Sequence, residues 1–219
     1  QHLAELLDGI RGVYPLLRGR LPLPWGIVRE WRRIEPTEAH TSIPKVVILA
    51  MIVSSLLRGF VRSAAGTWLA SASGLRPNEY HELPWRDISF PEDRLDYNSV
   101  SIFVSISDAK GAWAGSAKQS ARAEDGDLLD FLRAVKVYYR PDRLETMIGC
   151  SPSTQRKRFQ TMTEDCLMLY GERSRPKGIV EASLRASYAS ALFEECNDLS
   201  YTAWRLRVKD LSTLRHYVQ

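Results

Sequence analysis

The stretch "SGLRPNEYHELPWRDISF", residues Ser73–Phe90, lies where the sequence pattern changes from helical to extended. Residues 43–83 are strongly apolar and predict two helices, with Gly59 near the turn between them. Three segments after this range predict short strands: "WRDISF", "SVSIFVSIS" and "SAKQSARAE". The second shows the pattern most clearly, because it carries alternating Val, Ile and Phe. A glycine-bearing turn, "AKGAWAGSA", separates the last two. The stretch therefore predicts a pair of core helices followed directly by a small antiparallel sheet.

The sequence after the sheet returns to helical patterns. Helices are expected over residues 127–139, 153–171 and 180–196, and Ser153 is the expected N-cap of the second. The fold class predicted is therefore mainly α with a small antiparallel β-sheet (α+β), the sheet lying between about Trp85 and Glu124.

The N-terminal part of the chain has a different pattern. Leucines at helical spacing predict a helix over residues 2–17, and Pro22 and Pro24 interrupt the pattern after it. We predict an N-terminal helix and linker in residues 1–40 and one folded domain in residues 41–219.

Composition excludes several classes of protein but selects none. The chain has 219 residues, a net charge of +4 and three cysteines without a CxxC pair, which argues against a disulfide scaffold or a zinc site. The cysteines favour a reducing, intracellular compartment. The longest apolar run, Val46–Leu57, is too short to span a bilayer. The mild basic excess is compatible with a polyanionic partner.

Three charged or aromatic residues stand out, and each also has an ordinary structural interpretation. Arg76 could cap a helix or pair with Glu79, three residues later. Arg185 follows Leu184 in an apolar segment, where an arginine requires a partner. Tyr217 by itself is an ordinary aromatic residue near the end of a helix.

Taken together, these residues resemble the signature of tyrosine recombinases. "SGLRPNEYHEL" resembles the family's first box, with Arg76 and Glu79 at the expected spacing, and "SLRASYASAL" and "DLSTLRHYV" resemble the second. Arg185 and Tyr217 are 217 − 185 = 32 residues apart, as in that family. The segments "LRGRLPLPWGIVREWRRIEP", "LRGFVRSAAGTWLASASGLRPNEYHEL", "SLRASYAS" and "STLRHYVQ" more narrowly resemble recombinase-like proteins of DIRS-type retroelements and their algal relatives.

The resemblance implies DNA breakage and rejoining through a 3′-phosphotyrosyl intermediate, with Tyr217 as the nucleophile. Arg76 and Arg185 would bind the non-bridging phosphate oxygens, because a guanidinium is always charged and presents a donor fork that matches phosphate. A lysine in the β-hairpin turn would be the general acid, with Lys110 the first choice and Lys118 the alternative. The reaction needs no metal and no cofactor.

The sequence departs from the family pattern at two positions. Ala182 and Val208 stand where the family commonly has a histidine, and a histidine or tryptophan, respectively. Neither side chain can donate a hydrogen bond, and losing a donor to the scissile phosphate costs about 10²–10³ in rate. His216 is next to Tyr217 but points elsewhere on a helix, so it is a poor substitute.

Two functions remain open on the sequence alone. The first is a recombinase or integrase that acts on double-stranded DNA as a homo-multimer, in the nucleus if the host is eukaryotic. The second is a catalytically inactive, domesticated recombinase fold that serves as a DNA-binding or structural subunit of a protein assembly. Residues 2–17 would be the end of an N-terminal DNA-clamping, core-binding domain. Acidic residues around the nucleophile, with Glu181, Glu194 and Glu195 as candidates, would favour the second function.

Overall fold

The computed structural model describes residues 10, 13, 14, 41–106, 119–169, 179–208 and 211–214. The chain divides into two units, Gln1–Ala39 and His40–Gln219. In the first unit the backbone N–H of Tyr14 donates to the carbonyl of Ile10 at 2.8 Å, as in a helical turn. The fold described below is that of the second unit.

In the described part of the second unit, three α-helices precede the sheet. They are α3 (Lys45–Leu57), α4 (Val61–Ser73) and the short α5 (Pro77–His81). Gly59 has φ +74° in the turn before α4, and Gly74 has φ +64° at its C-terminal end, where its N–H donates to the carbonyl of Ala70. Glycine suits both positions because it adopts positive φ without a steric penalty. The left-handed turn at Gly74 redirects the chain into α5 and positions the residues that follow it.

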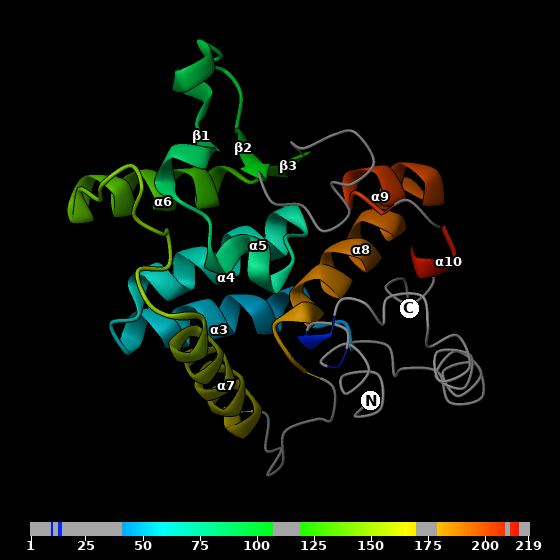
Figure 1. Cartoon of the computed structure of the whole chain (residues 1–219), viewed down its shortest axis with the longest axis horizontal. Helices are drawn as coiled ribbons and strands as arrows, with labels where there is room; N and C mark the ends of the chain where they lie inside the picture. The colour runs from blue at the N-terminus through cyan, green and yellow to red at the C-terminus, as the bar shows by residue number, and fades with distance from the viewer. Residues whose placement is uncertain are drawn as a thin grey trace. The chain divides into compact units, whose positions relative to one another are not determined.

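The sheet has three antiparallel strands in the order β1 (Ile88–Ser89), β2 (Ser101–Ile106) and β3 (Gln119–Glu124) (Figure 1). This confirms the predicted fold class. The first predicted strand is mostly a 3₁₀ turn, η2 (Trp85–Asp87), so that only two residues pair with β2. A second 3₁₀ turn, η3 (Pro91–Arg94), follows β1.

The helices after the sheet complete the domain. They are α6 (Gly126–Tyr139), α7 (Pro152–Leu169), α8 (Ala182–Cys196), α9 (Leu199–Arg205) and α10 (Leu211–Leu214). The starts of α6, α7 and α8 lie one or two residues from the predicted ones, and the start of α7 changes the expected cap. Ser153 lies inside α7 and is not its N-cap, because the helix begins at Pro152 and the Ser151 hydroxyl accepts from the N–H of Thr154 at 3.2 Å.

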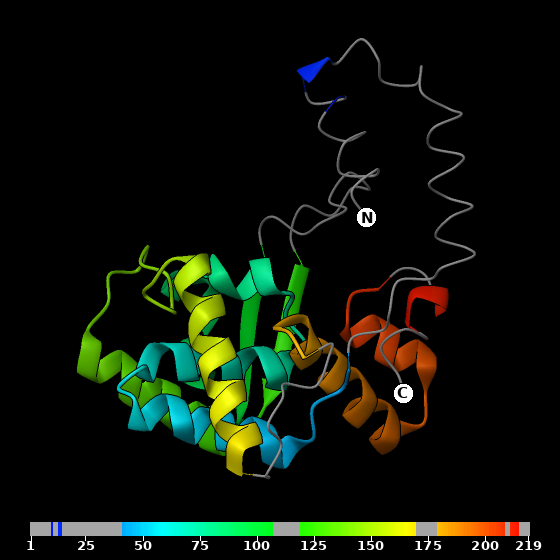
Figure 2. The ribbon, with the colours of Figure 1, turned by 90° about the horizontal axis from the view of Figure 1, so that it is seen from below.

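Helix α4 lies at the centre of the domain and packs against α3, α6, α7, α8 and β3 (Figures 1 and 2). Its buried face is made of small residues, which allow close approach of its neighbours. A Cβ on Gly66, for example, would lie 2.6 Å from the Cγ2 of Ile148. This close packing fixes the C-terminal end of α4, at Gly74, beside α8.

Candidate functional site

Three arginines from separate parts of the chain converge at the C-terminal end of α4. Arg76 is the N-cap residue of α5, Arg185 lies in the first turn of α8, and Arg207 follows α9. They share two acceptors, the carbonyl oxygen of Gly74 and the carboxylate of Glu79. We call these three residues the arginine cluster.

Arg185 is the most buried member, with 2% of its surface exposed. Its Nη1 donates to the carbonyl oxygen of Gly74 at 2.5 Å, and its Nη2 donates to the carbonyl oxygen of Leu206. The side chain therefore links the end of α4 to the end of α9. The sequence predicted that this arginine requires partners. The partners are backbone carbonyl oxygens, and the sequence did not indicate which groups they would be.

Arg76 and Glu79 form the local pair that the sequence allowed. The backbone N–H of Arg76 donates to Oε2 of Glu79 at 2.8 Å, and Nη1 of Arg76 donates to Oε1 at 2.6 Å. Glu79 thus caps α5 and also orients Arg76. The Arg76 side chain is 28% exposed, so solvent reaches the cluster from this side.

Arg207 is the member that the sequence analysis missed. Its Nη2 donates to Oε2 of Glu79 at 2.8 Å and lies 3.4 Å from the carbonyl oxygen of Gly74. Its side chain is 6% exposed, and its backbone has φ +58°. A left-handed conformation is uncommon for a residue other than glycine, and such residues are concentrated at functional sites.

The electrostatics of the cluster favour an anion, since among the described residues Glu79 is the carboxylate that pairs with these arginines, and it contacts only Arg76 and Arg207. Burial acts to raise the pKa of Glu79, but the charges of Arg207 and Arg76 and their hydrogen bonds outweigh it and hold this pKa below its usual value. Burial, together with repulsion by Arg76, lowers the pKa of Arg207. The guanidinium nevertheless keeps its charge at neutral pH. The arrangement can bind a phosphate-like anion.

The two positions that depart from the recombinase pattern lie in different surroundings. Val208 packs against a small apolar cluster that contains Ala203, Leu206 and Leu214. Ala182 is the first residue of α8 and directly follows Glu181. The sequence-predicted residues Lys110, Lys118, His216 and Tyr217 lie outside the described residues.

Glu181 is buried in a polar network and is not among the residues that line the pocket described below. Its Oε1 accepts from the hydroxyl of Tyr80 at 2.6 Å and lies 3.0 Å from Nε2 of His81. Burial, and then the Glu181 charge, raise the pKa of Tyr80 far above its usual value. Tyr80 is therefore a poor nucleophile at neutral pH, although it lies near the cluster in sequence.

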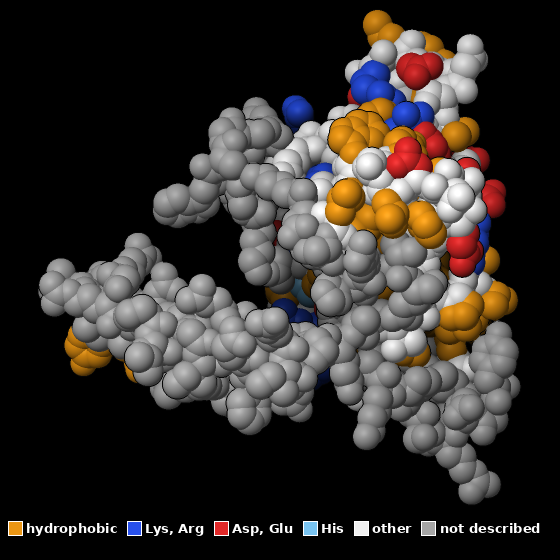
Figure 3. Space-filling view, turned by 90° about the vertical axis from the view of Figure 1, so that its right-hand side faces the viewer, with side chains coloured by type: hydrophobic (Ala, Val, Ile, Leu, Met, Phe, Trp, Pro, Cys, Tyr) orange, Lys and Arg blue, Asp and Glu red, His pale blue; other side chains and the backbone are white. Residues whose placement is uncertain are grey.

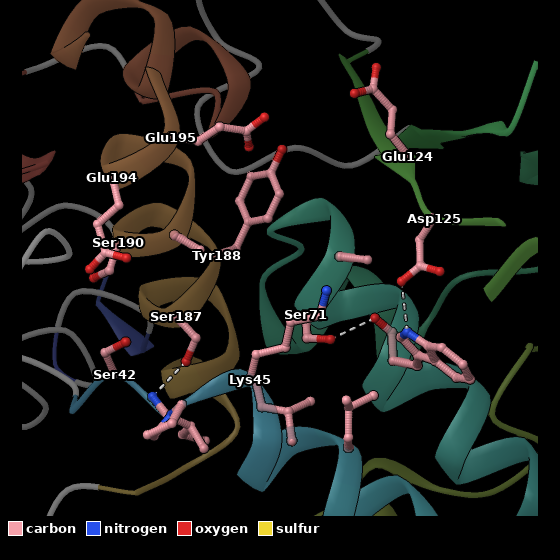
Figure 4. A pocket seen from close by; sticks show the side chains of 17 residues that line it. Ser42, Lys45, Ser71, Glu124, Asp125, Ser187, Tyr188, Ser190, Glu194 and Glu195 are labelled. Carbon is pink, nitrogen blue, oxygen red and sulfur yellow. Dashed lines mark hydrogen bonds between the residues drawn. The ribbon is translucent and has the colours of Figure 1, made fainter. Parts of the chain in front are cut away.

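A pocket of about 590 Å³ lies on the other side of Tyr188, between α8, the start of α3 and the end of β3 (Figure 4). Glu194 and Glu195 line it, as do two further carboxylates, Glu124 and Asp125. Tyr188 lines the pocket, and its ring packs closely on Gly74, where an added Cβ would lie 2.6 Å from Cδ1 of Tyr188. This pocket is acidic, and DNA phosphates would be repelled from it.

Charge is mixed on the described part of one face of the molecule. Figure 3 shows acidic, basic and hydrophobic side chains interspersed there. Among the described residues, His, Cys, Asp and Glu side chains form no group that could hold a metal ion. No helix in the described ranges has the length and apolar character needed to cross a membrane.

Comparison with solved structures identifies the fold. The site-specific recombinase XerH, bound to palindromic difH substrate in a post-cleavage complex, matches 82% of this chain at 16% identity, with a TM-score of 0.59. The XerA recombinase matches 84% at 12% identity, with a TM-score of 0.60. The Tn1549 transposon integrase, in complex with a circular intermediate DNA, matches 84% at 11% identity, with a TM-score of 0.54.

These matches span 50%, 60% and 63% of the respective chains, so this protein corresponds to only part of each. No family model and no curated protein matches the sequence. At these identities the likeness is one of fold. The described part of residues 41–214 has the fold of a tyrosine recombinase catalytic domain.

Proposed function

We propose that this chain breaks and rejoins double-stranded DNA through a 3′-phosphotyrosyl intermediate. The observation that carries the proposal is the convergence of Arg76 and Arg185 on the turn at Gly74, in a fold shared with DNA-bound recombinases. Two guanidinium groups suit the transition state, because negative charge accumulates on the non-bridging oxygens of the phosphate. The four sequence segments given above further suggest a recombinase derived from a mobile element of the DIRS type.

In this reaction the oxygen of Tyr217 attacks phosphorus and forms the phosphotyrosyl bond, while the bond to the 5′ oxygen breaks. Lys110, or Lys118 in its place, donates a proton to that leaving oxygen, and the phenolic proton passes to solvent. Attack by a free 5′-hydroxyl on the phosphotyrosine reverses the step and rejoins the strand. The energy of the phosphodiester is conserved, so no energy cofactor is consumed.

Recombination pairs two DNA sites, so we propose that the active form is a homo-multimer on DNA. The chain corresponds to part of the recombinases that it resembles. A DNA clamp would accordingly come from outside residues 41–219. The cellular location proposed is an intracellular compartment, the nucleus in a eukaryotic host.

The proposal is tested with a pool of random-sequence DNA duplexes, each carrying a nick near the centre. Cleavage beside a nick releases a short fragment, so the covalent complex accumulates. We expect a detergent-resistant protein–DNA adduct with the wild-type chain and none with Tyr217→Phe, which keeps the aromatic ring but has no attacking oxygen. An equal adduct yield from both chains would exclude Tyr217 as the nucleophile.

A second candidate function is a DNA-binding or structural subunit without strand-transfer chemistry. The acidic pocket beside Tyr188 and the apolar side chains of Ala182 and Val208 favour it. DNA binding without any adduct from the nicked pool would support the DNA-binding form. Absence of both would support a structural role in a protein assembly.

A further inference from the structure

Arg207 has hydrogen-bonding capacity that the described protein does not use. Its Nη2 contacts Glu79 and Gly74, but neither Nε nor Nη1 has a hydrogen-bond partner among the described residues, and both atoms are covered. A guanidinium carries one N–H on Nε and two on Nη1. Leaving buried charged donors unmet is costly, and most buried polar groups have partners. The unmet donors therefore point to a ligand.

The position of these donors identifies the ligand class. Arg207 lies beside Arg76 and Arg185 and shares an acceptor with each, Glu79 with the first and Gly74 with the second. Three guanidinium groups leave an excess of positive charge after Glu79 is counted. A tetrahedral phosphate oxyanion matches both the charge and the donor fork of arginine.

The turn after α9 explains why Arg207, and not its neighbour, reaches this place. The N–H of Arg207 donates to the carbonyl of Trp204, and the N–H of Val208 donates to the carbonyl of Ala203. This turn directs Val208 into the apolar cluster and Arg207 toward Glu79. Residue 207, and not residue 208, therefore faces the polar acceptors Glu79 and Gly74.

We propose that Arg207 is a third phosphate-binding guanidinium, which contacts a DNA phosphodiester through Nε and Nη1 and supplies the donor that Val208 lacks. This inference rests on the proposed function, because the phosphate is that of the DNA strand to be cleaved. Since both nitrogens are covered in this structure, binding must displace the covering atoms or draw the side chain toward the exposed side of Arg76.

The first test uses inorganic phosphate and needs no DNA chemistry. In a proton–nitrogen NMR spectrum, the Nε–H signal of Arg207, assigned by its loss in Arg207→Lys, should move as phosphate replaces chloride at constant ionic strength. The signal of Arg205, two residues away with partners Tyr201 and Arg122, should stay in place. A fixed Arg207 signal would show that the residue only neutralises Glu79, and would overturn the proposal.

The second test uses the nicked DNA pool. Arg207→Lys keeps a positive charge for Glu79, and its unfolding midpoint should stay close to that of wild type. Its adduct yield should fall about 10- to 100-fold, the effect expected on losing one charge-assisted hydrogen bond. Arg205→Lys is the matched control and should retain the wild-type yield. Equal yields from the folded Arg207→Lys and wild-type chains would contradict the proposal.

The two tests separate this inference from the proposed function. A phosphate-dependent Arg207 signal without any adduct from the wild-type chain would support the phosphate site and contradict the strand-transfer reaction. A wild-type adduct that Arg207→Lys leaves unchanged would support the reaction and contradict the role of Arg207.

Discussion

Replacing Arg185 by methionine tests whether this side chain holds the site together. Met has an unbranched side chain that can occupy much of the same space, but it donates no hydrogen bond. The substitution leaves the carbonyl oxygen of Leu206 without this donor and leaves that of Gly74, among the described contacts, with the 3.4 Å contact from Arg207. An acceptor that loses its partner in a buried site costs about 1–3 kcal/mol.

Removing a buried charge also relieves some desolvation, so the combined loss of unfolding free energy should be about 2–4 kcal/mol. In a domain of this size that corresponds to a fall of about 4–16 °C in the melting temperature. Urea denaturation followed by tryptophan fluorescence gives the free energy, and calorimetry gives the melting temperature. Arg86→Met, at an exposed arginine, is the matched control and should change stability by no more than about 0.5 kcal/mol.

A loss below about 0.5 kcal/mol for Arg185→Met would contradict a stabilising role for Arg185, because the two carbonyl contacts would then contribute nothing. The same two contacts make Arg185→Lys a test of stability as well as of activity. A single ammonium cannot reproduce two diverging contacts, so we expect partial destabilisation together with the loss of activity. Activity measurements on Arg185 variants must therefore be compared at equal folded fractions.

Three further predictions follow from the structure and the proposed reaction. Glu79→Gln should be less stable than wild type at neutral pH. The difference in unfolding free energy between the two chains should shrink as pH falls below about 4.3, the usual glutamate pKa, because the stabilising carboxylate of wild type becomes protonated. A difference that does not depend on pH would contradict the pairing of Glu79 with the arginines. Gly66→Ala should lower the unfolding free energy by about 1–3 kcal/mol, because the added Cβ overpacks against Ile148. Gly126→Ala is the control and should not lower it, because its added Cβ meets only Val100 at 3.8 Å. Equal effects of the two substitutions would contradict the close packing of α4. A substrate with sulfur in place of the bridging 5′ oxygen (a 5′-phosphorothiolate) should restore adduct formation to Lys110→Ala, because a thiolate leaves without a proton. It should not restore adduct formation to Arg76→Ala. Rescue of Lys118→Ala instead of Lys110→Ala would assign the general acid to Lys118.

Much of the fold was predictable because it depends on local patterns. The alternation of residues 101–106 predicted β2, and the apolar run with Gly59 predicted the boundary between α3 and α4. The short β1 was less predictable, because its pairing with β2 is tertiary and leaves residues 85–87 in a 3₁₀ turn. Ser151 and Ser153 are both plausible caps by residue type, so the sequence could not choose between them.

The part of the candidate site that forms within one short segment was predictable from residue spacing along the sequence. Arg76 and Glu79 are three residues apart at the start of a helix, where such a pair forms locally. The role of Arg207 was not predictable, because family spacing pointed to position 208 and the left-handed turn that redirects the chain leaves no clear pattern. The one available signal was an arginine next to the expected donor position.

The most direct test of the account is to identify the residue joined to DNA. The adduct from the nicked pool is digested with protease and nuclease, and the remaining peptides are sequenced by mass spectrometry. The account predicts a C-terminal peptide in which Tyr217 carries a nucleotide through a phosphodiester to the 3′ oxygen. Attachment of the nucleotide to any other residue, or unmodified Tyr217 peptide alone from a confirmed adduct, would contradict it.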